Sequence, residues 1–278
     1  MVSKFTEKQS VFSVNPFVEV IKERGIKDKD IFLTLALSIS TIQDEGFREL
    51  ILNWVTSYPE ISGIYLMINF NEVSKQICDY NKLICYFSFI KELRGADLKI
   101  ICGYTGLEEL MLCCMDIDII TMGAFENIRK FDIDKFLDNE GTKRGPAPRI
   151  YFPKLMNSIR FVTANTIRED KPELWEKIYT PTKYSEKIFD DYVNQRIVPH
   201  FTKKEQYMHY FILVSEQIKS LLSLPVPDRI NDLKQKIKDA NNYYHELDAN
   251  EILWFDRNCT GDHLPTWFRA TKWIQDNY

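Results

Sequence analysis

The 278-residue chain lacks a marked surplus of either charge and lacks any long apolar run. Its 36 Lys and Arg residues face 40 Asp and Glu residues, for a net charge of -4, so total charge does not indicate a nucleic-acid-binding protein. No window approaches the roughly 18 apolar residues of a membrane-spanning helix. The opening residues, MVSKFTEKQS, are charged where a signal peptide would be apolar. We therefore expect a cytoplasmic protein without a membrane partner.

Metal-binding and nucleotide-binding motifs are also missing. The chain holds 6 cysteines and 4 histidines, but no C-x-x-C pair and no H-x-x-x-H pair. Neither G-x-G-x-x-G nor G-x-x-x-x-G-K-[ST] occurs. We expect no metal site, and the sequence names no cofactor. Buried reduced thiols are the expected state of the cysteines in apolar segments, which are Cys78, Cys85, Cys102, Cys113 and Cys114.

Short β-rich runs alternate with helical patterns over the first two thirds of the chain, which is typical of βα units and a largely parallel sheet. The continuously apolar run Ile31–Ser40 predicts a strand that is covered on both faces. After it, Asp44 is the expected N-cap of a helix that ends before Pro59. The predicted strands are Ser10–Val14, Ile31–Ser40, Gly63–Phe70, Leu98–Tyr104 and Asp118–Gly123.

Beyond Gly123 the alternating pattern weakens, and from Lys171 onward it turns helical. Three further runs are marginal strands, namely Arg149–Phe152, Ile159–Val162 and Ile252–Phe255. Apolar stripes predict helices around Met208–Leu222 and Ile230–Leu247, and a Trp-bearing helix from His263 to Trp273 that docks on the core. We expect a βα-repeat core over residues 1–165, with a helical region over residues 166–278 that packs on this core or completes it.

The segment from Ile31 to Phe136 resembles consecutive βα units of a (β/α)8 barrel. The resemblance is carried by two stretches, LKIICGYTG and DIDIITMGAFENIRKF, the second of which holds a strand that ends in Gly123. It implies an α/β, TIM-barrel-like fold with a helical C-terminal region. With five supported strands and three marginal ones, a closed barrel and an incomplete, irregular one both stay open.

Ligands of parallel α/β proteins bind at the carboxyl ends of the strands, where the βα loops converge. Asn69 and Asn71 flank Phe70 at one such end and could orient a base or sugar. In GAFENIRK, a glycine that admits a close ligand precedes cations that could hold an anion. The candidate ligand-binding residues are Ser40, Asn69, Asn71, Thr105, Gly123, Asn127 and Arg129.

These positions favour a protein that binds a small anionic or nucleotide-like ligand at the strand ends. The sequence names no catalytic residue and leaves open whether the protein is an enzyme; if it is one, group transfer or hydrolysis is expected. The alternative is a non-catalytic scaffold or interaction subunit of a larger assembly, with a protein partner or a second copy. Lys143, Arg144 and Arg149 lie beside Tyr151 and Phe152, a combination that would also suit nucleic acid.

Overall fold

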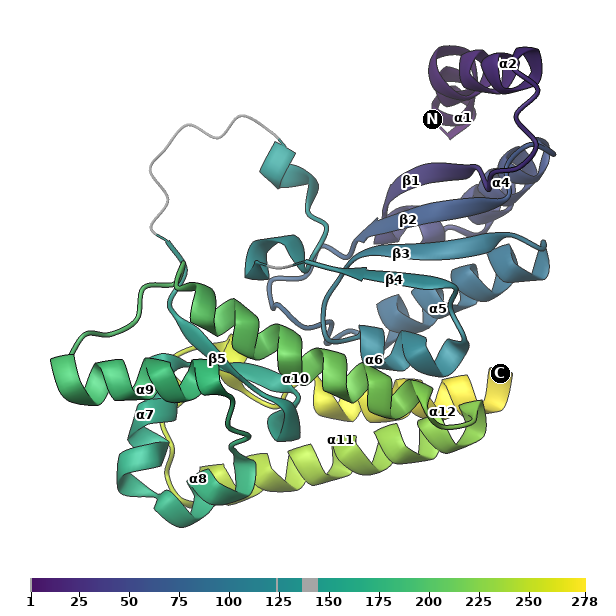
Figure 1. The fold of residues 1–278 in the computed structure, drawn as a ribbon. Helices are drawn as coiled ribbons and strands as arrows, with labels where there is room; N and C mark the ends of the chain where they lie inside the picture. Colours follow the sequence, from purple (N-terminus) through teal and green to yellow (C-terminus); the bar gives the residue numbers. More distant parts are fainter. Residues whose placement is uncertain (1, 124, 137–144) are drawn as a thin grey trace.

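The computed structural model describes residues 2–123, 125–136 and 145–278 (Figure 1). The strands are β1 (Phe32–Ser38), β2 (Gly63–Asn69), β3 (Lys99–Thr105), β4 (Ile119–Met122), β5 (Arg149–Phe152) and β6 (Asn157–Arg160). The α-helices are α1 (Val2–Gln9), α2 (Asn15–Glu23), α3 (Ile39–Gln43), α4 (Glu45–Thr56), α5 (Tyr80–Gly95), α6 (Glu109–Leu112), α7 (Phe161–Asp170), α8 (Pro172–Ile178), α9 (Lys183–Gln195), α10 (Lys204–Leu222), α11 (Val226–Ala249) and α12 (Leu264–Asn277). Short turns are the π-helical η1 (Ser10–Val14) and the 3-10 helices η2 (Cys113–Met115), η3 (Glu126–Ile128), η4 (Ile133–Phe136), η5 (Pro153–Leu155) and η6 (Arg257–Cys259).

A four-stranded sheet in the order β1-β2-β3-β4 forms the first layer, and all its neighbouring strands are parallel. The four corresponding sequence predictions are thereby confirmed to within about two residues. β5 and β6 pair antiparallel in a separate two-stranded sheet, with Arg149 opposite Arg160. The fold is therefore mixed α/β, and within the described ranges the parallel sheet has open edges and does not close into a barrel.

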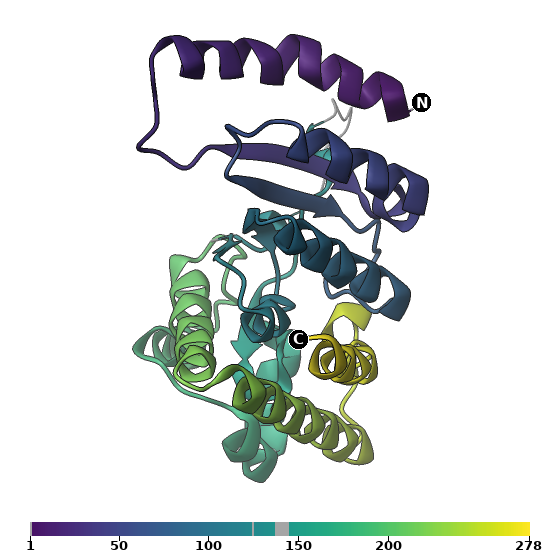
Figure 2. The ribbon, with the colours of Figure 1, turned by 90° about the vertical axis from the view of Figure 1, so that its right-hand side faces the viewer.

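Helices α4 and α5 lie on one face of the parallel sheet (Figures 1 and 2). On β1, Leu35 and Leu37 are buried, whereas the alternate residues Thr34 and Ala36 are exposed. The prediction that this strand is covered on both faces is therefore wrong. The small residues between the leucines are the solvent side of a half-covered edge strand, because successive side chains of a strand point to opposite faces.

The predicted first strand, Ser10–Val14, is helical instead. This turn continues α1 into α2, and Val14, Val18 and Ile21 form a buried stripe at helical spacing. Pro16 lies two residues after this turn and has no N–H to donate to the carbonyl four residues earlier. The missing hydrogen bond accounts for a widened, π-helical turn before the proline. Asn15 continues the helix from η1 into α2. Gly25, at φ 62°, lies just after the C-cap of α2 in the left-handed conformation that commonly ends a helix.

The C-terminal helices surround β5 and β6 and pack against the end of the parallel sheet (Figure 1). α12 packs on α5 and α11, and its Trp267 is fully buried, with its indole N–H donated to the Ile77 carbonyl at 3.0 Å. The predicted docking helix is confirmed. The marginal strand Ile252–Phe255 is wrong, because Leu253 and Phe255 are exposed in an irregular segment.

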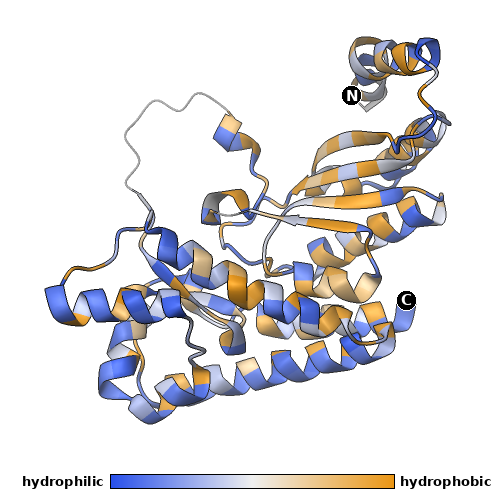
Figure 3. Ribbon diagram, in the orientation of Figure 1, coloured by the Kyte–Doolittle hydropathy of each residue, from blue (hydrophilic) through white to orange (hydrophobic). Residues whose placement is uncertain are grey.

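The apolar residues concentrate in the strands and in the inward sides of the helices (Figure 3). All six cysteines are free thiols, and four of them, Cys102, Cys113, Cys114 and Cys259, are buried in this core. Burial raises the pKa of Cys102, Cys113 and Cys114 to about 12, so these thiols stay protonated at neutral pH. Among the residues that the structure describes, no helix is both long enough and apolar enough to cross a membrane.

Candidate functional site

A cavity of about 610 Å³ lies beyond the carboxyl ends of three parallel strands. The segment after β2 contributes Lys75 and Gln76, and the turn after β3 contributes Gly106 and Leu107. The segment after β4 contributes Phe125, Glu126, Ile128, Arg129, Lys130 and Lys135. The remaining wall comes from β5, β6, the segment before β5 and the beginning of α10 with the residues preceding it. The cavity thus lies between the parallel sheet and the C-terminal region, in the place where α/β proteins hold ligands.

The lining combines positive charge with aromatic surface. Among the described residues, one carboxylate, that of Glu126, lines the cavity together with five cations. These cations are Lys75, Arg129, Lys130, Lys135 and Arg149. The aromatic residues are Phe125, Tyr151, Phe201, Tyr207 and Tyr210. Such a wall favours an anion that also carries an apolar or ring-bearing group.

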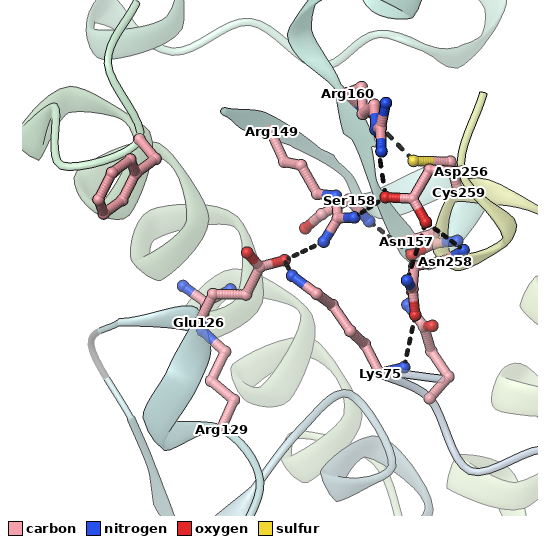
Figure 4. A network of polar contacts seen from close by, with 12 residues as sticks. Lys75, Glu126, Arg129, Arg149, Asn157, Ser158, Arg160, Asp256, Asn258 and Cys259 are labelled. Atoms are coloured by element: carbon pink, nitrogen blue, oxygen red, sulfur yellow. Dashed lines mark hydrogen bonds and ion pairs between the residues drawn. The ribbon is translucent and has the colours of Figure 1, made fainter. Parts of the chain in front are cut away.

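Arg149, at the start of β5, connects η3 with the segment before η6 (Figure 4). Its Nη1 donates to Glu126 Oε1 at 2.8 Å, and its Nη2 forms an ion pair with Asp256. Asp256 also accepts from Arg160 Nε at 3.2 Å, and Lys75 Nζ pairs with the same Glu126 oxygen. The Arg149 side chain is 8% exposed, so the guanidinium is held between two carboxylates away from most solvent.

These contacts favour the charged forms of Glu126, Asp256 and Arg149. Burial by itself would raise the pKa of Glu126, but the charges of Lys75 and Arg149 outweigh it and the pKa is lowered. Burial would also raise the pKa of Asp256. The hydrogen bonds from Asn258 and the charge of Arg149 outweigh burial, so the pKa of Asp256 is lowered. Burial lowers the pKa of Lys75 despite Glu126. An anion entering here would therefore meet fixed positive charge with little surrounding water.

Arg129 lies against the opposite wall. Its guanidinium carbon is 3.2 Å from the centre of the Tyr210 ring, and its Nε donates to the Gly123 carbonyl at 3.2 Å. Tyr210 stands edge-on to Tyr151, with ring centres 5.1 Å apart. The segment that follows β4 is thereby joined to helix α10 through a cation stacked on an aromatic ring.

The carboxyl end of β3 carries two buried acids next to this cavity. Glu108 Oε1 accepts from the Gly106 backbone N–H at 2.8 Å, and Glu109 Oε2 accepts from Thr105 Oγ1 at 3.3 Å. Within the described residues Glu109 Oε1 has no hydrogen-bond partner. Burial raises the pKa of Glu108 to about 7 and that of Glu109 well above its ordinary value. Both carboxyls are therefore poised to hold protons at neutral pH.

The backbone beside these acids departs from regular strand geometry. Tyr104 has φ 57°, and the pairing of β3 with β4 shifts between Cys102 and Thr105. Glu108 and Lys130 line a second, small cavity of about 10 Å³, roughly the room that one water needs. A left-handed non-glycine residue and a strand irregularity often accompany functional sites. The carboxyl end of β3 is therefore a candidate functional site.

The sequence-predicted residues fall into two groups. In the first, Ser40 Oγ lies 2.9 Å from Ser38 Oγ, Asn71 Nδ2 donates to Ser38 Oγ at 3.2 Å, and Asn69 Oδ1 accepts from the Asn71 N–H at 3.1 Å. This cluster at the ends of β1 and β2 does not line the 610 Å³ cavity. As ligand-binding residues, its members stay predictions.

In the second group, Arg129 lines the large cavity and contacts Gly123, while Thr105 lines the small cavity, with its Oγ1 3.0 Å from the Thr121 carbonyl oxygen. Asn127 belongs to η3, and its side chain is outside what the structure describes. Of the cations considered for nucleic acid, Arg149 lines the cavity, whereas Lys143 and Arg144 lie outside the described residues.

Sequence reasoning missed Lys75, Glu108, Glu109 and Asp256, and noted Glu126 only as part of a motif. The acid pair had a signal, since Glu108 and Glu109 stand between Leu107 and Leu110 at the start of an otherwise apolar run. Charged residues in such a run after a strand end are expected to be buried for a reason. Lys75 and Asp256 carried no comparable local pattern.

The comparisons with known proteins supply no relative. No protein-family model, no curated protein and no solved structure matches this chain.

Proposed function

We propose that the protein binds a small anionic, nucleotide-like ligand in the 610 Å³ cavity, at the carboxyl ends of the strands of an open, barrel-like βα layer. The observation that carries the proposal is the cavity wall, on which, among the residues that the structure describes, five cations and five aromatic residues accompany a single carboxylate. Its volume lies within the range of small-molecule sites. Cations suit a phosphate group, and aromatic rings suit a base or another planar group.

The proposal extends to catalysis through the neighbouring acids. A carboxyl group with a pKa near 7, such as that of Glu108, can both release and accept a proton at neutral pH. If the ligand is a substrate, group transfer or hydrolysis fits an anionic ligand beside such a group. Binding is the part of the proposal that is tested first, because it needs no knowledge of the reaction.

Lys75→Met is expected to weaken the binding of adenosine 5′-monophosphate and of inorganic phosphate about tenfold, because one charge-assisted contact is worth roughly 1.5–3 kcal/mol. Adenosine, which lacks the phosphate, should bind weakly and equally to both proteins. Isothermal titration calorimetry at two salt concentrations measures this, and added salt should weaken phosphate binding.

Lys99→Met is the matched control, since Lys99 pairs with Asp30 at the amino end of β3, away from the cavity. Phosphate binding should be unchanged in that variant. If the unmodified protein binds neither phosphate-containing ligand, or if the two lysine variants weaken binding equally, this cavity is not the anion site.

A second function, a non-catalytic interaction subunit, is favoured by the open face of the parallel sheet. The register places Thr34, Tyr65, Ile101 and Ile119 in one row across that face, and Ile119 is 47% exposed. Native mass spectrometry tests this function directly. A defined oligomer that is lost on Ile119→Lys, with no bound phosphate compound, would favour it over ligand binding.

A further inference from the structure

The carboxylate of Glu126 lies where an anionic ligand would be expected. A single oxygen, Oε1, contacts both Lys75 Nζ and Arg149 Nη1. The two cations come from different parts of the chain, one after β2 and the other at the start of β5. Two cations converging on one oxygen is the arrangement that an oxygen of a phosphate group also takes. Building on the proposed function, we propose that Glu126 occupies the ligand's anion subsite and that a phosphate group displaces it from Lys75 and Arg149.

The Arg149 guanidinium and the backbone of Lys75 are held in place from behind, independently of Glu126. Arg149 Nη2 is paired with Asp256, and the backbone N–H of Lys75 donates to Asn258 Oδ1 at 2.8 Å. Asn258 in turn donates its backbone N–H and its Nδ2 to Asp256 Oδ1, at 3.0 and 2.8 Å. The β5 guanidinium and the backbone of Lys75 therefore share one support. Removal of the Glu126 charge leaves that support intact.

Glu126 and Asp256 differ in how firmly they are held. Asp256 is 11% exposed and accepts from Arg149, Arg160 and, twice, from Asn258. Glu126 is 21% exposed, lines the cavity, and sits in a three-residue 3-10 helix. Asp256 is thus the structural partner of Arg149, and Glu126 is its exchangeable partner on the cavity side.

Displacement by a phosphate keeps the charge of the site balanced. The lowered pKa of Glu126 keeps it anionic in the empty cavity, where it neutralises the two cations. A phosphate brings more negative charge and more acceptor oxygens than one carboxylate, so it competes effectively for the same donors. Glu126 then acts as a filter against weaker anions, because each anion has to displace an existing ion pair.

The test compares phosphate binding by the unmodified protein, Glu126→Gln and Glu126→Asp, with calorimetry and inorganic phosphate as the probe. Glu126→Gln removes the competing charge, so phosphate should bind about tenfold more tightly than to the unmodified protein. Glu126→Asp keeps the charge and should show no such gain. Glu246 on α11 forms an ion pair with Lys177 on α8. Glu246→Gln is therefore the matched control and should bind phosphate like the unmodified protein.

Each outcome has a distinct meaning. In one outcome, Lys75→Met weakens phosphate binding, but Glu126→Gln binds phosphate no more tightly than the unmodified protein does. This outcome would show that Glu126 orients the cations, and it would overturn only this inference. An absence of phosphate binding by both the unmodified protein and Glu126→Gln would overturn the proposed function as well. Circular dichroism verifies the folding of each variant, and Glu126→Ala replaces Glu126→Gln if the latter does not fold.

Discussion

Replacement of Arg149 with methionine is expected to lower the free energy of unfolding by about 3–5 kcal/mol, the cost typical of removing one partner from a buried charged network. Methionine keeps an unbranched apolar stem but removes the contacts of the guanidinium to Glu126 and Asp256. Both carboxylates then keep their charge in a site from which water is largely excluded. Urea unfolding at neutral pH, followed by tryptophan fluorescence, measures the change.

Arg160→Met provides the control, because Arg160 contacts the same Asp256 but is 36% exposed. An exposed ion pair of this kind contributes about 1 kcal/mol or less, so the variant should be nearly as stable as the unmodified protein. Asp256→Asn in the Arg149→Met background should recover part of the lost stability, since it removes one of the two carboxylates that lost the Arg149 contact. Equal losses for the two arginine variants would mean that Arg149 does not anchor the network.

The sequence predicted the parallel layer well because its strands are local, apolar and regularly spaced. Gly63–Phe70 and Leu98–Tyr104 match β2 and β3 closely. Short segments with the same composition were ambiguous. Ser10–Val14 has the composition of a strand, yet Val14 belongs to a buried helical stripe, and tertiary packing on Trp54 and Tyr58 decides its state.

The candidate site was only partly predictable, because its key pairs are far apart in the sequence. Arg149 and Asp256 are separated by 107 residues, and Lys75 lies 183 residues before Asn258, its backbone partner. No local pattern connects such residues. Strand-end reasoning found Arg129 because it depends on topology alone, whereas the β5 wall of the cavity depends on how the C-terminal region packs on the sheet.

The stability of Glu108→Gln relative to the unmodified protein is expected to rise with pH, by about 3 kcal/mol between pH 4.5 and about pH 8. In the folded chain burial raises the pKa of Glu108 to about 7, against the ordinary value of 4.5 in the unfolded chain. Between these values the unfolded chain binds fewer protons at this group than the folded chain does. The free energy of unfolding therefore decreases as pH rises through this window, and the uncharged amide of the Glu108→Gln variant avoids the loss.

Measuring a difference between two proteins removes the titrating groups that do not interact with Glu108. Burial lowers the pKa of His209 and of His263 to about 4, so both histidines act in the same pH range with the opposite sign. They are present in both chains and cancel in the comparison.

Glu60→Gln is the matched control with the reverse trend, because the hydrogen bond from Lys22 lowers the pKa of Glu60. Relative to the unmodified protein, that variant should lose stability as pH rises through the ordinary range of a carboxyl group. Urea unfolding at pH 4.5, 6 and about 8 gives all three values. A pH-independent difference for Glu108→Gln would mean that the Glu108 carboxylate is already solvated in the fold, and it would then lose its place as the proton-transfer group beside the cavity.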